Sequence, residues 1–582
     1  MTRPQLFGDG VRRSTGNQAR RYNLLAARLI AELVTNSLGP RGMDKMFVDV
    51  MGEVTVTKDG ATLLRKIDVE HPAAKVIIEA SNAVDNEVGD GTTSVAVLAG
   101  ALVRRAEELL AIGIAPSTII DGYSKALDIS LKELEEMSAR CDSSDRLIMK
   151  KLARTCLASK QLSYAGDKAL DIIVQAVCSV TDFEKEQVDI DDIKIEEKQG
   201  SMTDFQLVSG VVIDKTIDSS SMPKTVAPAR IILIDDDLEG KRTRTDAEIR
   251  INTPEMIKSY SNGEVTMIRS KIQHIIDSGA NVVVSRKGIN TFAQSLLKEH
   301  GIISIRRVKE NDLLWLAKAT GASVSARLDH EHGHDHEHHH HHHDDHHYHH
   351  HDIEITLGHA ERVCEKQVGD DRMVFVEGCK DPRSVTILIR ANSKRMLDEF
   401  HRSTLDAINV LKDFIRNPAV VAGGGAAEAA MARRTRTEAS NYEGREQLVI
   451  QKFADALEEI PIVIARNAGM NPIDTLAALR SRHALSNGRA HTVGVDAIGR
   501  KVGDMPPDVI EPAVVKEQVL KTAVEAVNLL IRVDDVLMAK PKMQTHSHND
   551  GTEHSHAGGD KEHRHDHFDR LGKKQRQMHH YY

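Results

Sequence analysis

The sequence predicts a multidomain α+β protein in which two helical ends enclose an α/β centre. A chain of 582 residues is too long for one hydrophobic core, because cores stop growing near about 250 to 300 residues and longer chains divide into domains. Apolar residues recur at helical spacing near both ends, whereas the middle alternates short β-type runs with helical segments. We therefore expect a helical domain built from both chain ends, with the α/β domain inserted between them.

The N-terminal quarter of the chain is predicted to be mostly helical. Leu24, Leu29 and Leu33 follow helical spacing, and Gly39-Pro40 then supplies a stop signal. Val54-Thr-Val-Thr alternates as a strand does and runs through a Lys-Asp-Gly turn into a further helical stretch. The helices predicted here are 19–38, 92–111 and 116–138.

The middle and the C-terminal part differ in pattern. The predicted strands are 231–234, 281–285, 302–305 and 385–389, with a helix over 291–299 among them. The predicted C-terminal helices are 404–416, 424–435, 447–458 and 513–533, and the cluster Gly423-Gly424-Gly425 interrupts them.

Composition excludes several classes of protein. The net charge of −9 with neutral histidines gives no general attraction to nucleic acid or to anionic membranes. The five cysteines form no CxxC pair, which indicates reduced thiols in the cytoplasm. The N-terminus has no apolar signal region, and no run approaches the roughly 18 apolar residues of a membrane span. We expect a cytoplasmic protein without nucleic-acid or membrane partners.

A glycine-rich turn carries the first chemical signal. The chain has no G-x-x-x-x-G-K-[ST] motif and therefore no predicted P-loop. In the run Gly89-Asp90-Gly91-Thr92-Thr93-Ser94, the glycines let backbone N–H groups approach an anion, and the hydroxyls stand at the positive end of the following helix. Asp90 suits Mg²⁺, which takes one or two carboxylates plus phosphate oxygens. The residues alone equally allow a helix cap after a turn.

A larger set of ordered motifs resembles the group II chaperonins of the thermosome type, over roughly residues 5–538 apart from a histidine insert. The matching motifs are Leu38-Gly-Pro-Arg-Gly-Met-Asp, Thr57-Lys-Asp-Gly-Ala-Thr, Asn86-Glu-Val-Gly-Asp-Gly-Thr-Thr-Ser, Ala115-Pro, Leu157-Ala-Ser-Lys160, Val368-Gly-Asp-Asp-Arg-Met, Phe375-Val-Glu-Gly-Cys, Asn417-Pro, Val421-Ala-Gly-Gly-Gly and Val509-Ile-Glu-Pro512.

The resemblance implies an ATP-hydrolysing site in the helical domain. Asp59 and Asp406 would orient or deprotonate the attacking water, Lys160 would sense the γ-phosphate, and Asp90 would bind Mg²⁺. The residues implied to contact the nucleotide are Leu38, Gly39, Pro40, Gly91, Thr92, Thr93, Ser94, Gly424 and Glu511, with Glu511 on the ribose.

One departure from the family pattern precedes Asp406. The sequence reads His401-Arg-Ser-Thr-Leu-Asp-Ala, whereas the family usually has Glu-Arg-Ser-Leu-His-Asp-Ala. The aspartate is retained, so hydrolysis is expected to survive, with a rate that depends on the changed surroundings.

The resemblance also implies a domain plan and partners. The helical equatorial domain would comprise 1–142 and 404–538, the small intermediate domain 143–212 and 370–403, and the α/β apical domain 213–369, with a helical protrusion over 236–272, a histidine insert over 329–352 and a disordered tail over 539–582. Spacing alone favours residues 236–263 as a solvated loop and helix, whereas the resemblance implies that 236–272 forms a built-in lid, so no cochaperonin is required. The expected assembly is a homo- or hetero-oligomeric double ring, with about eight or nine subunits per ring, that folds non-native proteins.

Histidines concentrate in two tracts. Of 31 histidines, 15 lie within residues 330–351 and nine within 546–580. Such low-complexity runs cannot bury a core, and histidine alternating with Asp and Glu predicts binding of Zn²⁺, Ni²⁺ or Cu²⁺. The alternative is a solvated tether that gains charge near the histidine pKa of about 6.5. The histidine tracts leave open a rival function, a metal carrier on a chaperonin scaffold. A third possibility, independent of the tracts, is a holdase that suppresses aggregation without ATP.

Overall fold

The computed structural model describes residues 12–201, 204–239, 254–325, 356–380, 383–485, 490–538, 544–547 and 553–556. It divides into a main unit, Asn23–Arg532, and a second unit comprising Met1–Tyr22 and Val533–Tyr582. The helices are α1 (Gly16–Thr35), α2 (Gly60–Lys66), α3 (Pro72–Val88), α4 (Thr92–Ala111), α5 (Pro116–Met137), α6 (Arg146–Leu157), α7 (Asp167–Val180), α8 (Pro254–Asp277), α9 (Thr291–Glu299), α10 (Glu310–Thr320), α11 (Lys394–Arg416), α12 (Ala426–Glu438), α13 (Arg445–Leu457), α14 (Glu459–Asn467), α15 (Pro472–Leu485) and α16 (Ala513–Arg532).

The strands are mostly short. They are β1 (Arg12–Thr15), β2 (Lys45–Val48), β3 (Val54–Thr57), β4 (Ala139–Arg140), β5 (Thr181–Asp182), β6 (Gln187–Val188), β7 (Ile193–Gln199), β8 (Gln206–Val208), β9 (Gly210–Ile213), β10 (Thr225–Val226), β11 (Ala229–Ile234), β12 (Val282–Ser285), β13 (Ile303–Ile305), β14 (Val324–Ser325), β15 (Gly358–Ala360), β16 (Arg362–Val368), β17 (Asp371–Glu377), β18 (Val385–Ala391), β19 (Ala419–Ala422), β20 (Val493–Asp496), β21 (Lys501–Asp504), β22 (Ile510–Pro512), β23 (Asp535–Met538), β24 (Gln544–Ser547) and β25 (Glu553–His556).

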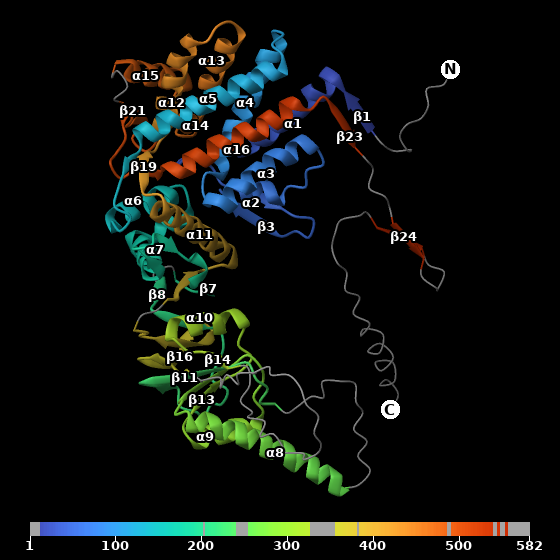
Figure 1. Cartoon of the computed structure of the whole chain (residues 1–582), viewed down its shortest axis with the longest axis vertical. Helices are drawn as coiled ribbons and strands as arrows, with labels where there is room; N and C mark the ends of the chain where they lie inside the picture. Colours follow the sequence, from blue (N-terminus) through green and yellow to red (C-terminus); the bar gives the residue numbers. More distant parts are fainter. Residues whose placement is uncertain are drawn as a thin grey trace, which may run out of the picture. The chain divides into compact units, whose positions relative to one another are not determined.

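Helices from both ends of the main unit share one hydrophobic core. α16 packs against α3, α4 and α5, although these helices lie at opposite ends of the sequence, and Figure 1 shows them side by side. Small residues also let α1 approach α4 closely: a Cβ on Gly100 of α4 would lie 2.4 Å from the Cβ of Ala31, on α1. The prediction that both chain ends build the helical core is confirmed.

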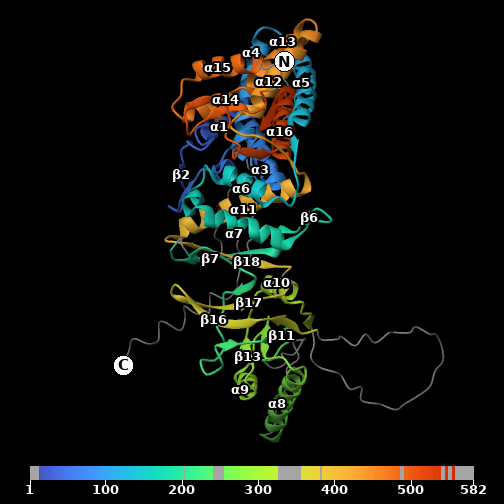
Figure 2. The same ribbon diagram turned by 90° about the vertical axis from the view of Figure 1, so that its left-hand side faces the viewer.

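The centre of the chain forms two sheets that share a second core. Parallel strands in the order β13-β12-β11-β14 make one sheet, which β15 extends antiparallel to β11, and antiparallel strands in the order β10-β16-β17-β9 make the other. Figure 2 shows β16 and β17 on one side of β11 and β13, with α8 and α9 on the other. Residues 231–234 and 282–284 are fully buried, as expected for near-continuous apolar runs in a covered parallel sheet.

The predicted protrusion, 236–272, is described over residues 236–239 and 254–272. Residues 240–253 lie outside the described residues, and α8 begins at Pro254. Ile268 and Ile272 anchor the end of α8 in the core of the α/β centre. The segment is therefore helical from Pro254 onward.

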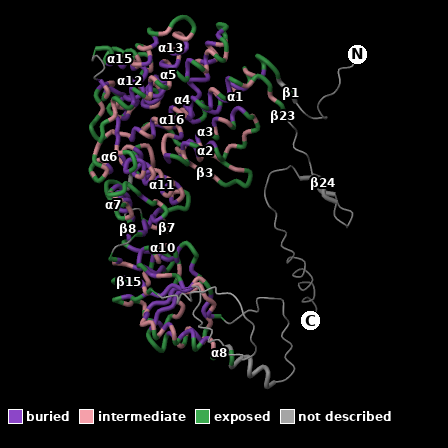
Figure 3. The backbone as a smooth tube through the Cα atoms, in the orientation of Figure 1, coloured by how far each residue is buried: buried purple, intermediate pink, exposed green. Residues whose placement is uncertain are grey.

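A third core lies around α11, which carries Asp406. The three-stranded sheet β7-β18-β8 packs with α6, α7 and α11 in this core, and Figure 3 marks its buried positions in purple. α11 begins at Lys394, ten residues before the predicted start, because Ser393 accepts a hydrogen bond from the Met396 amide (3.3 Å) and caps the helix. The charged residues of its first turns obscured the apolar stripe that Leu397 and Phe400 begin.

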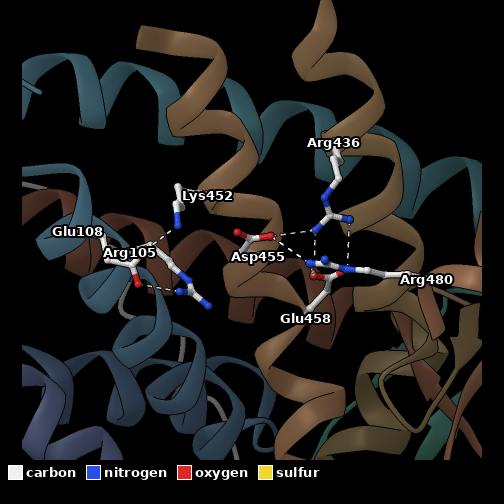
Figure 4. Close-up of polar contacts among 7 residues, drawn as sticks. All are labelled: Arg105, Glu108, Arg436, Lys452, Asp455, Glu458 and Arg480. Carbon is white, nitrogen blue, oxygen red and sulfur yellow. Dashed lines mark hydrogen bonds and ion pairs between the residues drawn. The ribbon is translucent and has the colours of Figure 1, made fainter. Parts of the chain in front are cut away.

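Ion pairs tie the C-terminal helices of the helical core together (Figure 4). Arg436 of α12 and Arg480 of α15 each lie 3.1 Å from a carboxylate oxygen of Asp455 on α13. Both arginines also bind Glu458, which is 4% exposed and sits between α13 and α14. The negative charge of the buried Glu458 carboxylate is compensated because both arginines bind it. Removal of either arginine would leave Glu458 less well paired.

The second unit contains paired terminal strands. β1 and β23 pair antiparallel, and Arg13 binds Asp535 across them at 2.6 Å. β24 and β25 also pair antiparallel; the rest of the tail predicted to be disordered, 539–582, lies outside the described residues. The histidine insert lies outside the described residues.

Two predictions from composition can be checked on the described part of the chain. None of its helices is long and apolar enough to cross a membrane. All five cysteines are free, as predicted.

Candidate functional site

The glycine-rich turn joins α3 to α4. Gly89 ends α3 in the left-handed conformation (φ 65°), and its amide donates to the Asp85 carbonyl oxygen at 3.0 Å. Gly91 is the N-cap residue of α4, also left-handed (φ 84°), and no side-chain hydrogen bond caps the helix there. The first amides of α4 therefore present the positive end of the helix without a side-chain acceptor, which is the arrangement that binds anions.

The turn opens onto a cavity of about 90 Å³. Ten predicted site residues line this cavity: Leu38, Gly39, Asp59, Asp90, Gly91, Thr92, Thr93, Ser94, Lys160 and Asp406. Three others, Pro40, Gly424 and Glu511, are not among its lining residues. Four further residues line the cavity without having been predicted as nucleotide or metal contacts: Ser37, Lys58, Gly89 and Ser159. Gly89 belongs to the glycine-rich run, Lys58 and Ser159 lie within other quoted motifs, and Ser37 adjoins Leu38, so the signal was their place in the sequence.

Asp59 is held by the start of α2. Its carboxylate accepts hydrogen bonds from the amides of Ala61 (3.2 Å) and Thr62 (2.8 Å) and from the Thr92 hydroxyl (3.0 Å). Burial raises the pKa of Asp59, but the bonds from Thr62 and Thr92 and the Lys160 charge outweigh burial, so its pKa lies below the ordinary value. Asp59 is thus an ionised, fixed acceptor on the cavity wall.

Lys160 and Asp406 form an ion pair across the cavity. Lys160 follows α6, Asp406 lies on α11, and their side chains are 10% and 17% exposed. Burial raises the pKa of Asp406 to about 7, while the Lys160 ammonium acts in the opposite direction. A carboxylate whose pKa lies near neutrality can accept a proton from water at physiological pH.

Three residues depart from the family pattern, His401, Thr404 and Leu405, and none of them lines the cavity. His401 pairs through Nδ1 with a carboxylate oxygen of Glu197, on β7. The Thr404 hydroxyl donates to the Phe400 carbonyl oxygen of the same helix at 2.7 Å. The departures therefore lie outside the cavity lining at Asp406.

Lys58 adds a second cation to the cavity. Its side chain is half-buried, and burial lowers its pKa, against the opposing charges of Asp44 and Glu399. The cavity lining then carries three aspartates and two lysines. Phosphates entering it would meet cations as well as helix amides.

Glu511 and the glycine cluster lie beside the cavity. β22 pairs with β19, which places Glu511 opposite Val421, just before the glycines. A Cβ on Gly423 would lie 2.8 Å from Oε1 of Glu511, so a side chain at this position would displace the carboxylate. At Gly91, a Cβ would lie 2.8 Å from Val519 of α16, the helix that begins two residues after Glu511. α16 thus connects the carboxylate to the glycine-rich turn.

The residues present fit a magnesium ion that arrives with a nucleotide. Among the described residues, no three His, Cys, Asp or Glu side chains are grouped as a metal site. Mg²⁺ needs fewer protein ligands when phosphate oxygens supply the rest. Asp90 lines the cavity and its Oδ1 accepts the Gly91 amide at 2.7 Å, which fixes the carboxylate at the phosphate-binding turn.

Comparison with known proteins relates the chain to one family. The model of the TCP-1/cpn60 chaperonin family matches residues 30–541. A thermosome subunit of Methanopyrus kandleri is 42% identical over 539 residues, covering 92% of this chain and 94% of the relative. The alpha subunit of the Archaeoglobus fulgidus thermosome is 43% identical over 542 residues, and the beta subunit from Thermococcus kodakarensis is 42% identical over 538 residues, each with the same two coverages.

Proposed function

The chain belongs to the TCP-1/cpn60 chaperonin family, and from that premise we propose that it hydrolyses Mg-ATP to drive the folding of non-native proteins. As a chaperonin subunit it is a molecular chaperone that works in a ring-shaped oligomer. The observation that carries the ATPase proposal is the cavity at the start of α4, where Asp59, Asp90, Lys160 and Asp406 converge.

The phosphates of ATP would bind at the N-terminus of α4, in contact with Gly91–Ser94. Asp59, fixed by three hydrogen bonds, would orient the attacking water, and Asp406 would accept its proton. Asp90 would hold Mg²⁺, which when bound neutralises charge on the phosphate oxygens. Leu38, Gly39 and Pro40, with Gly424 and Glu511, would contact the nucleoside.

The Lys160–Asp406 ion pair suggests how nucleotide binding would prepare the base. In the structure the ammonium is bound to the carboxylate. A γ-phosphate would compete for Lys160, because it offers several charged acceptors. Once Lys160 turns toward the phosphate, Asp406 would lose its counter-ion and become a stronger proton acceptor.

The assembly that we propose is a cytoplasmic double ring with about eight or nine subunits per ring, homo- or hetero-oligomeric, whose lid is built in. The protrusion 236–272, which includes most of α8, would close the central cavity of the ring in which clients fold. No cochaperonin would then be required. Hydrolysis would then bias a hinged intermediate domain between open and closed rings.

The experiment compares the wild-type protein with Asp406→Ala. ATP hydrolysis and refolding of a denatured client should both require Mg-ATP in the wild type, and the variant should bind nucleotide without turnover. Undiminished ATP hydrolysis in the variant would refute the assignment. Aggregation suppressed equally with and without ATP would instead support a passive holdase. Electron microscopy with and without ATP would report ring symmetry and lid closure.

The histidine tracts support a second candidate function, metal carriage. Fifteen histidines within residues 330–351 offer many imidazole ligands for Zn²⁺, Ni²⁺ or Cu²⁺. Deletion of 330–351 discriminates between the two functions. Refolding should persist and metal uptake should fall if chaperone activity and metal binding are separate; loss of the protein's function with the tract would favour the carrier.

A further inference from the structure

The carboxylate of Glu511 is bound by a buried lysine that the nucleotide contacts above do not include. Lys516 of α16 lies 2.5 Å from Oε2 of Glu511 and 2.8 Å from Oε1 of Glu428, on α12. The side chains of Lys516 and Glu428 are 8% and 6% exposed. Lys516 therefore joins three elements, α12, α16 and β22, on the side of the helical core that carries the glycine cluster.

The charges of this triad do not cancel. Two carboxylates share one ammonium, and Oε2 of Glu428 has no hydrogen-bond partner among the described residues. Burial holds the pKa of Glu511 above its ordinary value; the Lys516 ammonium opposes this rise and the Glu428 charge adds to it. Without the ammonium, Glu511 would stand near a buried like charge and would take up a proton or turn away.

Lys516 occupies only one oxygen of Glu511. It binds Oε2, while Oε1 lies over Gly423, 2.8 Å from the point that a Cβ would occupy. The free oxygen is thus held in one orientation beside the glycine cluster. An ionised carboxylate held in this way accepts hydrogen bonds from hydroxyl groups, and hydrogen bonds to charged groups are the stronger ones.

We propose that Lys516 is a positioning residue for sugar recognition: by holding the Glu511 carboxylate in one orientation over Gly423, it makes the site select ribonucleotides over deoxyribonucleotides. This inference rests on the proposed function, because it takes Glu511 as the ribose contact. Lys516 itself touches no nucleotide. A site built to bind a hydroxyl rejects the analogue that lacks it, since its polar group is then left unpaired.

The test measures the dissociation constants of ATP, 2′-deoxy-ATP and 3′-deoxy-ATP on the assembled full-length protein. The wild type should bind at least one deoxy analogue about 10- to 100-fold more weakly than ATP, as expected for hydrogen bonds to a charged group. In Lys516→Met that ratio should fall to about threefold or less. Lys521→Met is the matched control, because Lys521 lies on the same helix and pairs with Glu517 on the surface (2.6 Å, 44% and 40% exposed).

A purely structural role predicts a different result. Lys516→Met would then weaken ATP and both deoxy analogues by the same factor, and the inference would be overturned, as it would be by a wild type that does not discriminate. In Glu428→Gln, Glu511 is the only charged partner left to Lys516, so discrimination between ATP and the deoxy analogues should be preserved or increased. Loss of discrimination in Glu428→Gln would overturn the inference. This variant also provides the test if Lys516→Met fails to assemble. A wild type that neither binds nor hydrolyses ATP would refute the proposed function itself.

Discussion

Replacement of Lys160 by methionine should move the acidic limb of the pH–rate profile for ATP hydrolysis. The wild-type kcat/KM for ATP, which reports groups of the nucleotide-free protein, should fall as the pH drops through about 7, because burial places the pKa of Asp406 there and a general base must be ionised to act. Lys160 now opposes protonation of Asp406. Two opposite unit charges about 3 Å apart attract by roughly 5 kcal/mol at an effective dielectric constant near 20.

Solvent access and relaxation reduce this value, and an opposite charge in contact typically lowers a carboxyl pKa by about 1 to 3 units. In the nucleotide-free protein, where Lys160 pairs with Asp406, Lys160→Met should therefore move the limb to between about pH 8 and 10. The assay is kcat/KM for ATP from pH 5.5 to 10. Lys150→Met is the control, because Lys150 on α6 pairs with the exposed Asp171 at 2.6 Å, and its limb should stay near pH 7. An unchanged limb in Lys160→Met, with turnover retained, would refute the coupling.

Three further outcomes are expected. Asp406→Asn should lower kcat by about 10²- to 10⁴-fold and leave ATP affinity within about threefold of the wild type. The control Asp413→Asn removes another buried carboxylate of α11, outside the cavity, and should leave kcat within about twofold. Equal losses of kcat in the two variants would contradict the role of Asp406. Gly91→Ala should destabilise the fold by about 2 kcal/mol, because its left-handed backbone and the 2.8 Å approach of Val519 exclude a methyl group, and an unchanged thermal-unfolding midpoint would contradict this. Lys58→Met should weaken ATP binding by about 3- to 10-fold in isothermal titration, and unaltered affinity would exclude a phosphate contact.

Local signals in the sequence predicted much of the fold and part of the site. The bounds of α4 and α9 match the predicted ranges, because each has clear apolar periodicity and an adjacent start signal, Gly91 or Asn290. The start of α11 was missed because its cap at Ser393 is followed by charged residues. For the site, the motifs identified the residue types, but the motif Thr57-Lys-Asp-Gly-Ala-Thr did not indicate that Lys58 would line the cavity beside Asp59.

By itself the sequence determined which segments become helices and strands, and where a glycine-rich turn could meet an anion, because these depend on neighbours within a few residues. Only the tertiary structure decided that Asp59, Lys160 and Asp406 share one cavity, and that Lys516 stands between Glu428 and Glu511. Those outcomes depend on contacts between residues up to about 350 positions apart and on burial, which turns ordinary surface charges into strongly coupled pairs.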